Sequence, residues 1–96
     1  MGRVVFSDPA RNLEIYEYAA APTDDLDVWF EHPGETVLHL IGGSLRIEFG
    51  SHPDVVLEAG DCVVHPGTIP HRWTVVGDEP IRLFLLVVRS DAAAQR

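Results

Sequence analysis

Glycine and proline occur at short intervals along this chain and separate it into brief apolar runs. The 96 residues include eight glycines and seven prolines. Several of the runs alternate apolar and polar residues, which is the pattern of a β-strand with one buried face. No segment of useful length repeats its apolar residues with the period of a helix. The sequence therefore predicts an all-β fold.

The expected strands follow from these runs. They are residues 13–20, 26–30, 36–41, 44–49, two short strands within 55–66, then 71–76 and 81–88. So many short strands in a small domain predict a sandwich or a small barrel that curls to protect its strand edges. A chain of this length is expected to form one domain.

Charge and composition narrow the classes of function. The formal net charge is −8, and the basic residues are scattered arginines with no lysine. Nucleic-acid binding and a polybasic membrane patch are therefore not expected, and Schiff-base chemistry is excluded. The one cysteine, Cys62, lies in an apolar run and is expected to be buried. With no long apolar segment, the chain is expected to be a soluble, cytoplasmic protein.

The stretch GDCVVHPGTIPH, residues 60–71, resembles the second sequence motif of the cupin family. That motif is a glycine, five residues, a proline, one residue, a glycine, two residues and a histidine. Gly60, Pro66 and His71 occupy matching positions. Thr68 stands where the motif has its inner glycine, and Gly67 lies one position earlier. The resemblance implies that His71 points into the mouth of a barrel.

The stretch FEHPGETVLHLIGG, residues 30–43, is similar to the first cupin motif. That motif supplies two histidines and a glutamate as metal ligands, followed by a glycine that matches Gly43. In this chain Phe30 stands at the first histidine, His32 at the second and Thr36 at the glutamate. One of the three ligands of this motif is therefore retained.

The resemblance implies a small double-stranded β-helix, or jelly-roll, barrel. Its core is expected at about residues 28–88, with an N-terminal strand arm at 1–27 and a frayed tail at 89–96. A homodimer is also expected, because a short all-β chain has many strand edges. The segment 13–18 is the strand predicted to pair across the two subunits.

Strand alternation independently groups the candidate site residues. Phe30, His32 and Thr36 share one parity with the leucines of the same run, and His71 shares a face with Trp73. Such a cavity would be mostly apolar with a few convergent polar groups, as small-molecule sites usually are. The predicted ligand-binding residues are Phe30, His32, Thr36, Leu38, His71 and Trp73.

Metal binding is a further hypothesis for this cavity. His32 and His71 are the candidate ligands for a divalent ion such as Zn, Fe, Ni or Mn. Glu31 or Glu35 could supply a third ligand if the strand carries a β-bulge, since one extra residue reverses the facing of a strand.

The other three histidines are expected to lie outside the site. His39 has the opposite parity and should face outward. His52 falls in a turn, and His65 is expected at the rim or on the surface.

Three functions remain open from the sequence. The first is a binding module that holds a small organic ligand with weakly bound metal or none. The second is an enzyme, either a metal-dependent oxygenase or isomerase, or a metal-free cyclase or isomerase that uses His71 and His32. The third is a structural or regulatory dimer partner with a vestigial cavity. Elemental analysis of protein purified without added metal would best separate the first two.

Overall fold

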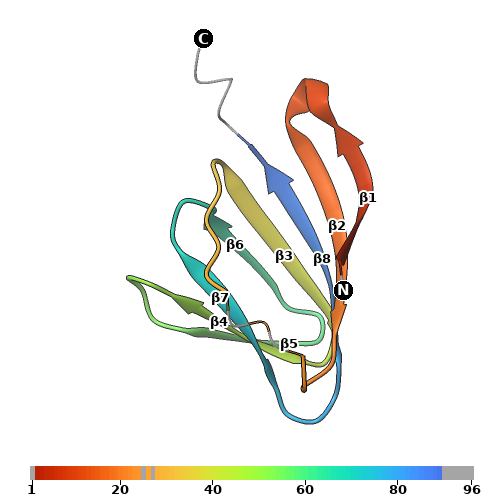
Figure 1. Cartoon of the computed structure of the whole chain (residues 1–96), viewed down its shortest axis with the longest axis vertical. Helices are drawn as coiled ribbons and strands as arrows, with labels where there is room; N and C mark the ends of the chain where they lie inside the picture. Colours follow the sequence, from red (N-terminus) through yellow and green to blue (C-terminus); the bar gives the residue numbers. More distant parts are fainter. Residues whose placement is uncertain (1, 25, 27, 90–96) are drawn as a thin grey trace.

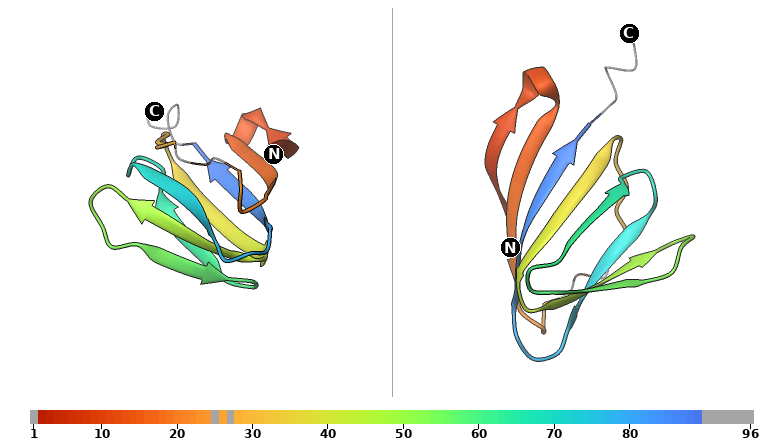
Figure 2. Two further views of the ribbon diagram at one scale, coloured as in Figure 1. Left: turned by 60° about the horizontal axis from the view of Figure 1, so that its bottom comes forward. Right: turned by 180° about the vertical axis from the view of Figure 1, so that it is seen from behind.

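The computed structural model describes residues 2–24, 26 and 28–89, which form two antiparallel β-sheets that face each other (Figures 1 and 2). One sheet has five strands in the order β1-β2-β8-β3-β6, and the other has three in the order β5-β4-β7. The strands are β1 Gly2–Asp8, β2 Leu13–Ala20, β3 Glu35–Gly42, β4 Ser44–Phe49, β5 Val55–Glu58, β6 Cys62–Pro66, β7 His71–Val76 and β8 Ile81–Val88. A short 3₁₀ helix, Pro9–Arg11, connects β1 and β2. The all-β prediction is confirmed.

The hydrophobic core lies between the two sheets. Alternate residues of β8 point into it, and this strand pairs with β2 on one side and with β3 on the other. Alternate residues of β3 and β4 meet them from the two sheets. The buried apolar side chains are Ala20, Leu38, Leu40, Leu45, Ile47, Leu57, Trp73, Ile81, Leu83, Leu85 and Val87.

Of the predicted strand at 26–30, the described residues 26 and 28–30 do not form a strand. Phe30 makes only an isolated bridge with His71, in which each backbone N–H donates to the other residue's carbonyl at 2.8 and 3.0 Å. Pro33 has no N–H to donate, so the run does not continue into β3. The β2–β3 connection comprises residues 21–34, and its described residues, 21–24, 26 and 28–34, are irregular apart from this bridge.

The N-terminal strands extend the larger sheet. Strand β2 pairs with β8 from Leu13 to Ala20 and with β1 along its other edge. Both edges of the strand predicted to pair across subunits, residues 13–18, are therefore occupied within the chain. The outer edge belongs to β1, where Val4, Val5 and Phe6 are 51%, 47% and 45% exposed.

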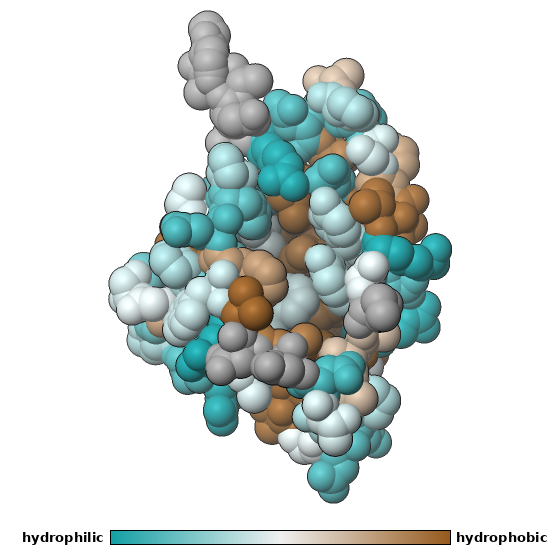
Figure 3. Space-filling view, in the orientation of Figure 1, coloured by the Kyte–Doolittle hydropathy of each residue, from teal (hydrophilic) through white to brown (hydrophobic). Residues whose placement is uncertain are grey.

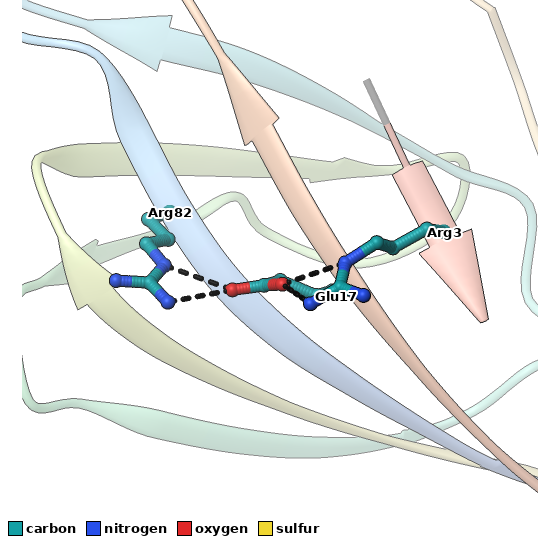
Figure 4. Close-up of polar contacts among 3 residues, drawn as sticks. All are labelled: Arg3, Glu17 and Arg82. Atoms are coloured by element: carbon teal, nitrogen blue, oxygen red, sulfur yellow. Dashed lines mark hydrogen bonds and ion pairs between the residues drawn. The ribbon is translucent and has the colours of Figure 1, made fainter. Parts of the chain in front are cut away.

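Glu17 of β2 connects three strands through its contacts with Arg3 and Arg82 (Figure 4). Its side chain lies on the face of β2 opposite that of Tyr16 and Tyr18. Its carboxylate accepts hydrogen bonds from Arg82 of β8, with the nearest nitrogen at 2.7 Å, and from Arg3 of β1 at 2.9 Å. The hydrogen bonds from Arg82 and then Arg3 lower the pKa of Glu17. Exposed ion pairs are individually weak, so the network adds only modestly to the backbone pairing that holds β1 against β2.

Two expectations about single residues are corrected. Cys62 is exposed rather than buried, because Val63 and His65 take the inward positions of β6. Arg89 is not frayed, since its N–H donates to the carbonyl of Asn12 at 2.9 Å and its guanidinium donates to Glu14 at 2.8 Å. The rest of the predicted frayed tail, residues 90–96, lies outside the described residues. Within the described chain, no helix has the length and apolar character needed to cross a membrane.

Candidate ligand-binding site

An open cavity of about 210 Å³ lies between the two sheets. Strands β2, β3 and β8 of the larger sheet, β7 of the smaller sheet and the β2–β3 connection contribute its walls. The face seen in Figure 3 is hollowed near its centre, with apolar side chains inside a more hydrophilic rim. The lining residues are Tyr16, Tyr18, Phe30, Glu31, His32, Thr36, His71, Trp73, Leu85, Val87 and Arg89.

Five of the six predicted ligand-binding residues meet in this cavity. They are Phe30, His32, Thr36, His71 and Trp73. Leu38 is different: its side chain has no exposed surface and belongs to the core between the sheets. Leu38 shares the parity of Thr36 but lies one pleat deeper, beyond the floor of the cavity.

Strand register explains the cavity residues that sequence reasoning missed. Thr36 of β3 is opposite Val87 of β8. Leu85 of β8 is in turn opposite Tyr16 of β2. Paired residues of neighbouring strands share a face, so Thr36 brings β8 and β2 into the site with it. These pairings join distant parts of the chain, so the alternation of apolar and polar residues within one strand cannot predict them.

His71 is the most constrained histidine of the site. It begins β7 and is only 4% exposed, and its Nδ1–H donates to the carbonyl of Ile69 at 2.7 Å. Pro70 restricts Ile69 to an extended conformation, which sets the position of that carbonyl. Because Nδ1 is bound, Nε2 is the ring nitrogen left to interact with the contents of the cavity.

His32 is held from both sides of its ring. Its Nδ1–H donates to the carbonyl of Pro33 at 3.1 Å, and its Nε2 accepts from the hydroxyl of Thr36 at 2.9 Å. Gly67 packs against the ring so closely that an added Cβ would lie 2.2 Å from Cε1. A side chain at position 67 would therefore displace the ring of His32.

His65 is a buried neighbour of the site, so its predicted place at the rim or surface is wrong. It is 6% exposed, and its ring centroid lies 4.6 Å from that of His71. It is opposite Thr36 in the β3–β6 pairing, which turns it inward. Only that pairing could have revealed it, because every residue around His65 in β6 is apolar or small.

Two buried nitrogens beside the cavity have no hydrogen-bond partner among the described protein groups. They are Nε2 of His65 and Nε1 of Trp73. The other nitrogen of His65, Nδ1, donates to the carbonyl of Pro66 at 2.9 Å. An unsatisfied buried polar group costs about 1–3 kcal/mol. Buried polar groups in native proteins normally have a hydrogen-bond partner, which water or a bound molecule can supply.

The remaining histidines face outward, as expected. His39 is exposed on β3, and His52 is exposed in the β4–β5 turn, where its ring contacts the hydroxyl of Ser51 at 2.9 Å.

Burial lowers the pKa of His71 below its usual value of 6.5, and the nearby rings of His65 and His32 lower it further. The hydrogen bond to Ile69 opposes these effects without cancelling them. His71 is therefore a neutral imidazole at neutral pH, with a basic nitrogen available to the cavity. Such a group can accept a proton or a hydrogen bond from a bound molecule.

Acidification is expected to destabilise the fold through His71. Because the pKa of His71 is lower in the folded state, the unfolded chain binds more protons once the pH falls below about 6.5. The stability that neutral His71 contributes is therefore fully present above that pH and decreases as the pH falls below it. Thermal unfolding followed between about pH 7.5 and 5.5 should show this loss, with a smaller loss in the His71→Gln variant. Glu14, whose pKa is lowered by Arg89, acts only in a more acidic range. Equal losses in both proteins would contradict the assignment to His71.

The donor set of the cavity does not fit a metal centre with three or four protein ligands. Across residues 2–24, 26 and 28–89, no three His, Cys, Asp or Glu side chains are placed to share one ion. Nε2 of His32 is already engaged by Thr36. Neither carboxylate suggested as a third ligand completes the set: Glu35 faces outward at the start of β3, and Glu31 is exposed at the cavity mouth.

Comparisons with solved structures agree with this architecture. A cupin-like protein from Thermotoga maritima is 21% identical, with a TM-score of 0.81 over 94% of this chain and 68% of that chain. A cupin-2 domain-containing protein from Shewanella frigidimarina is also 21% identical, with a TM-score of 0.71 over 93% of this chain and 80% of that chain. These likenesses confirm the double-stranded β-helix fold.

A structure of DMSP lyases offers a further likeness, with 29% identity and a TM-score of 0.69 over 79% of this chain and 38% of that chain. Among curated proteins, no relative matches. The sequence pattern of the cupin domain family matches residues 18–88, which include every cavity residue except Tyr16 and Arg89. The chain belongs to the cupin domain family.

Proposed function

We propose that this protein binds a small organic molecule in the barrel cavity and holds a metal ion weakly or not at all. The observation that carries this proposal is a cavity whose walls are mainly aromatic and aliphatic, with the polar groups of His71, His32 and Thr36 converging on it. This is the usual composition of a small-molecule site. Phe30 and Thr36 stand at two positions where the cupin motif has metal ligands, which supports weak or absent metal binding.

The two tryptophans allow a direct test of binding. Trp73 lines the cavity, whereas Trp29 is 46% exposed and its ring stacks with the guanidinium of Arg72 at 4.7 Å. In a fragment screen by NMR, ligands should shift the indole N–H signal of Trp73 and leave that of Trp29 in place. The Trp29→Phe variant assigns the two signals. A screen of neutral, anionic and cationic fragments in which none shifts Trp73 would count against the proposal.

Elemental analysis tests the metal part of the proposal. Protein purified without added metal and dialysed against a chelator should contain much less than one ion per chain, because one missing ligand weakens a site strongly. A stoichiometric ion that survives dialysis would place the metal-dependent enzyme ahead of the binding module.

A second candidate function is a metal-free enzyme that transfers a proton. The lowered pKa of His71 favours it, since a neutral imidazole at the wall of a cavity can act as a general base. His32 would then orient the substrate through its Nε2, which in this structure accepts a hydrogen bond from the hydroxyl of Thr36. Turnover of a bound ligand that is lost in His71→Gln, with binding retained, would favour this enzyme over a binding module.

We also propose that the protein forms a homodimer, with the edge of β1 as the contact in place of the strand predicted from sequence. Val4, Val5 and Phe6 are half exposed along this unpaired edge, which is the kind of edge that pairs with another chain. Val5→Lys should lower the dimer fraction in sedimentation. Val64→Lys, at a 62% exposed position on the other edge of the sheet, is the matched control. A monomeric wild-type protein at micromolar concentration would contradict the proposal.

A further inference from the structure

The cavity is surrounded by aromatic rings that come from three separate elements. Tyr16 and Tyr18 belong to β2, Trp73 and His71 to β7, and Phe30 to the β2–β3 connection. Neighbouring ring centroids are 6.1 Å apart for Tyr16–Tyr18, 5.3 Å for Tyr18–Trp73, 6.2 Å for Phe30–Trp73 and 6.2 Å for Phe30–His71. The rings therefore form one continuous wall, which we call the aromatic wall.

The rings of the aromatic wall are inclined to one another instead of stacked in parallel. The angle between ring planes is 87° for Tyr18–Trp73 and 46° for Phe30–Trp73. No two rings of the wall form a parallel pair between which a flat ligand could be sandwiched. Rings inclined in this way suit a compact, rounded group, which can contact several rings at once.

The charges at the mouth favour a positive ligand over a negative one. Glu31 lines the mouth, and among the described residues it forms no ion pair. Arg89 also lines the mouth, but its guanidinium is bound to the carboxylate of Glu14 at 2.8 Å. The two carboxylates thus outnumber the one guanidinium, in a chain whose net charge is −8. The resulting field attracts cations toward the cavity.

We propose that the ligand carries a methylated onium group, a quaternary ammonium or a sulfonium, and that the aromatic wall binds this group. This inference rests on the proposed function, because it names the chemical class of the molecule in the same cavity. The faces of aromatic rings are electron-rich and attract cations. A methylated onium has no N–H donors, so aromatic rings can cover its whole surface, whereas a primary ammonium has three donors and needs an acceptor for each of them.

Choline and 3,3-dimethyl-1-butanol separate the charge from the shape of the ligand. The second molecule is the neutral isostere of the first, with carbon in place of the positive nitrogen. In NMR titrations of the wild-type protein, choline should bind about tenfold more tightly than the isostere. Its N-methyl signal should move upfield, because the methyl groups would lie over ring faces. Propionate, as an anionic probe, should bind more weakly than both.

Two variants locate the onium group within the cavity. Phe30→Leu removes a ring that is 47% exposed, so folding should be unaffected, and choline affinity should fall severalfold while that of the isostere changes little. Glu31→Gln should weaken choline alone. Phe6→Leu, on the outer edge of β1, is the aromatic control and should change neither.

The outcomes distinguish this inference from the proposed function. Equal affinity for choline and its isostere would overturn the onium inference and leave a general apolar cavity, as the proposed function requires. Preference for propionate would overturn it in favour of an anionic ligand at Arg89. If none of the three probes binds, the onium inference fails, and the broader fragment screen alone decides the proposed function.

Discussion

Replacing Gly34 with alanine is expected to lower the free energy of unfolding by about 3 kcal/mol or more. Gly34 has a φ of +99°, a conformation that residues with a side chain rarely adopt. An added Cβ would also lie 1.8 Å from the carbonyl oxygen of Val88 and 2.6 Å from Cα of Arg89. Both are backbone atoms of β8 and its continuation, so they cannot rotate away as a side chain would.

Urea unfolding of Gly34→Ala and Gly42→Ala checks this expectation. Gly42 is the matched control, because an added Cβ there has no atom within 4 Å and its φ lies outside the positive range. Alanine at position 42 should leave stability within about 1 kcal/mol of the wild type. Ligand binding should also weaken in Gly34→Ala, since the carbonyl of Gly34 accepts the N–H of Gly67 at 2.8 Å, beside His32. Equal unfolding midpoints for the two variants would contradict the expected clash.

Replacing Leu38 with alanine is expected to cost about 2–5 kcal/mol of stability and to leave the affinity of the folded protein for its ligand unchanged. Leu38 has no exposed surface and packs in the core between the sheets, so its truncation removes buried apolar area and leaves a void. The loss is a large share of the stability of a small domain, which is typically about 5–15 kcal/mol.

The neighbouring residue provides the control for Leu38. His39 points outward and is exposed, so His39→Ala should change stability by no more than about 0.5 kcal/mol. Affinity is measured by the Trp73 signal at a temperature where each variant is folded. A tenfold loss of affinity in Leu38→Ala would show that its side chain helps to form the cavity after all.

The sequence by itself determined the class of fold and the strands that build most of it. Glycine and proline mark the turns, and alternation marks the faces, because both depend only on residues close together in the chain. The family motifs then placed His32 and His71 at one barrel mouth, and both line the cavity in the structure. Strand β1 and the irregular course of residues 28–30 were missed, since their pairing is decided by distant partners.

Only the tertiary structure decided which residues complete the site. Parity states which residues of one strand share a face, but not how deep each lies or which strand stands beside it. His65 turned out to be buried against His71 because β6 pairs with β3 in the register that puts His65 opposite Thr36. Tyr16 reached the cavity because β2 pairs with β8. Leu38 does not line the cavity because it lies too deep between the sheets. Its parity predicts only that it faces inward, which is true of core residues as well as of the cavity wall.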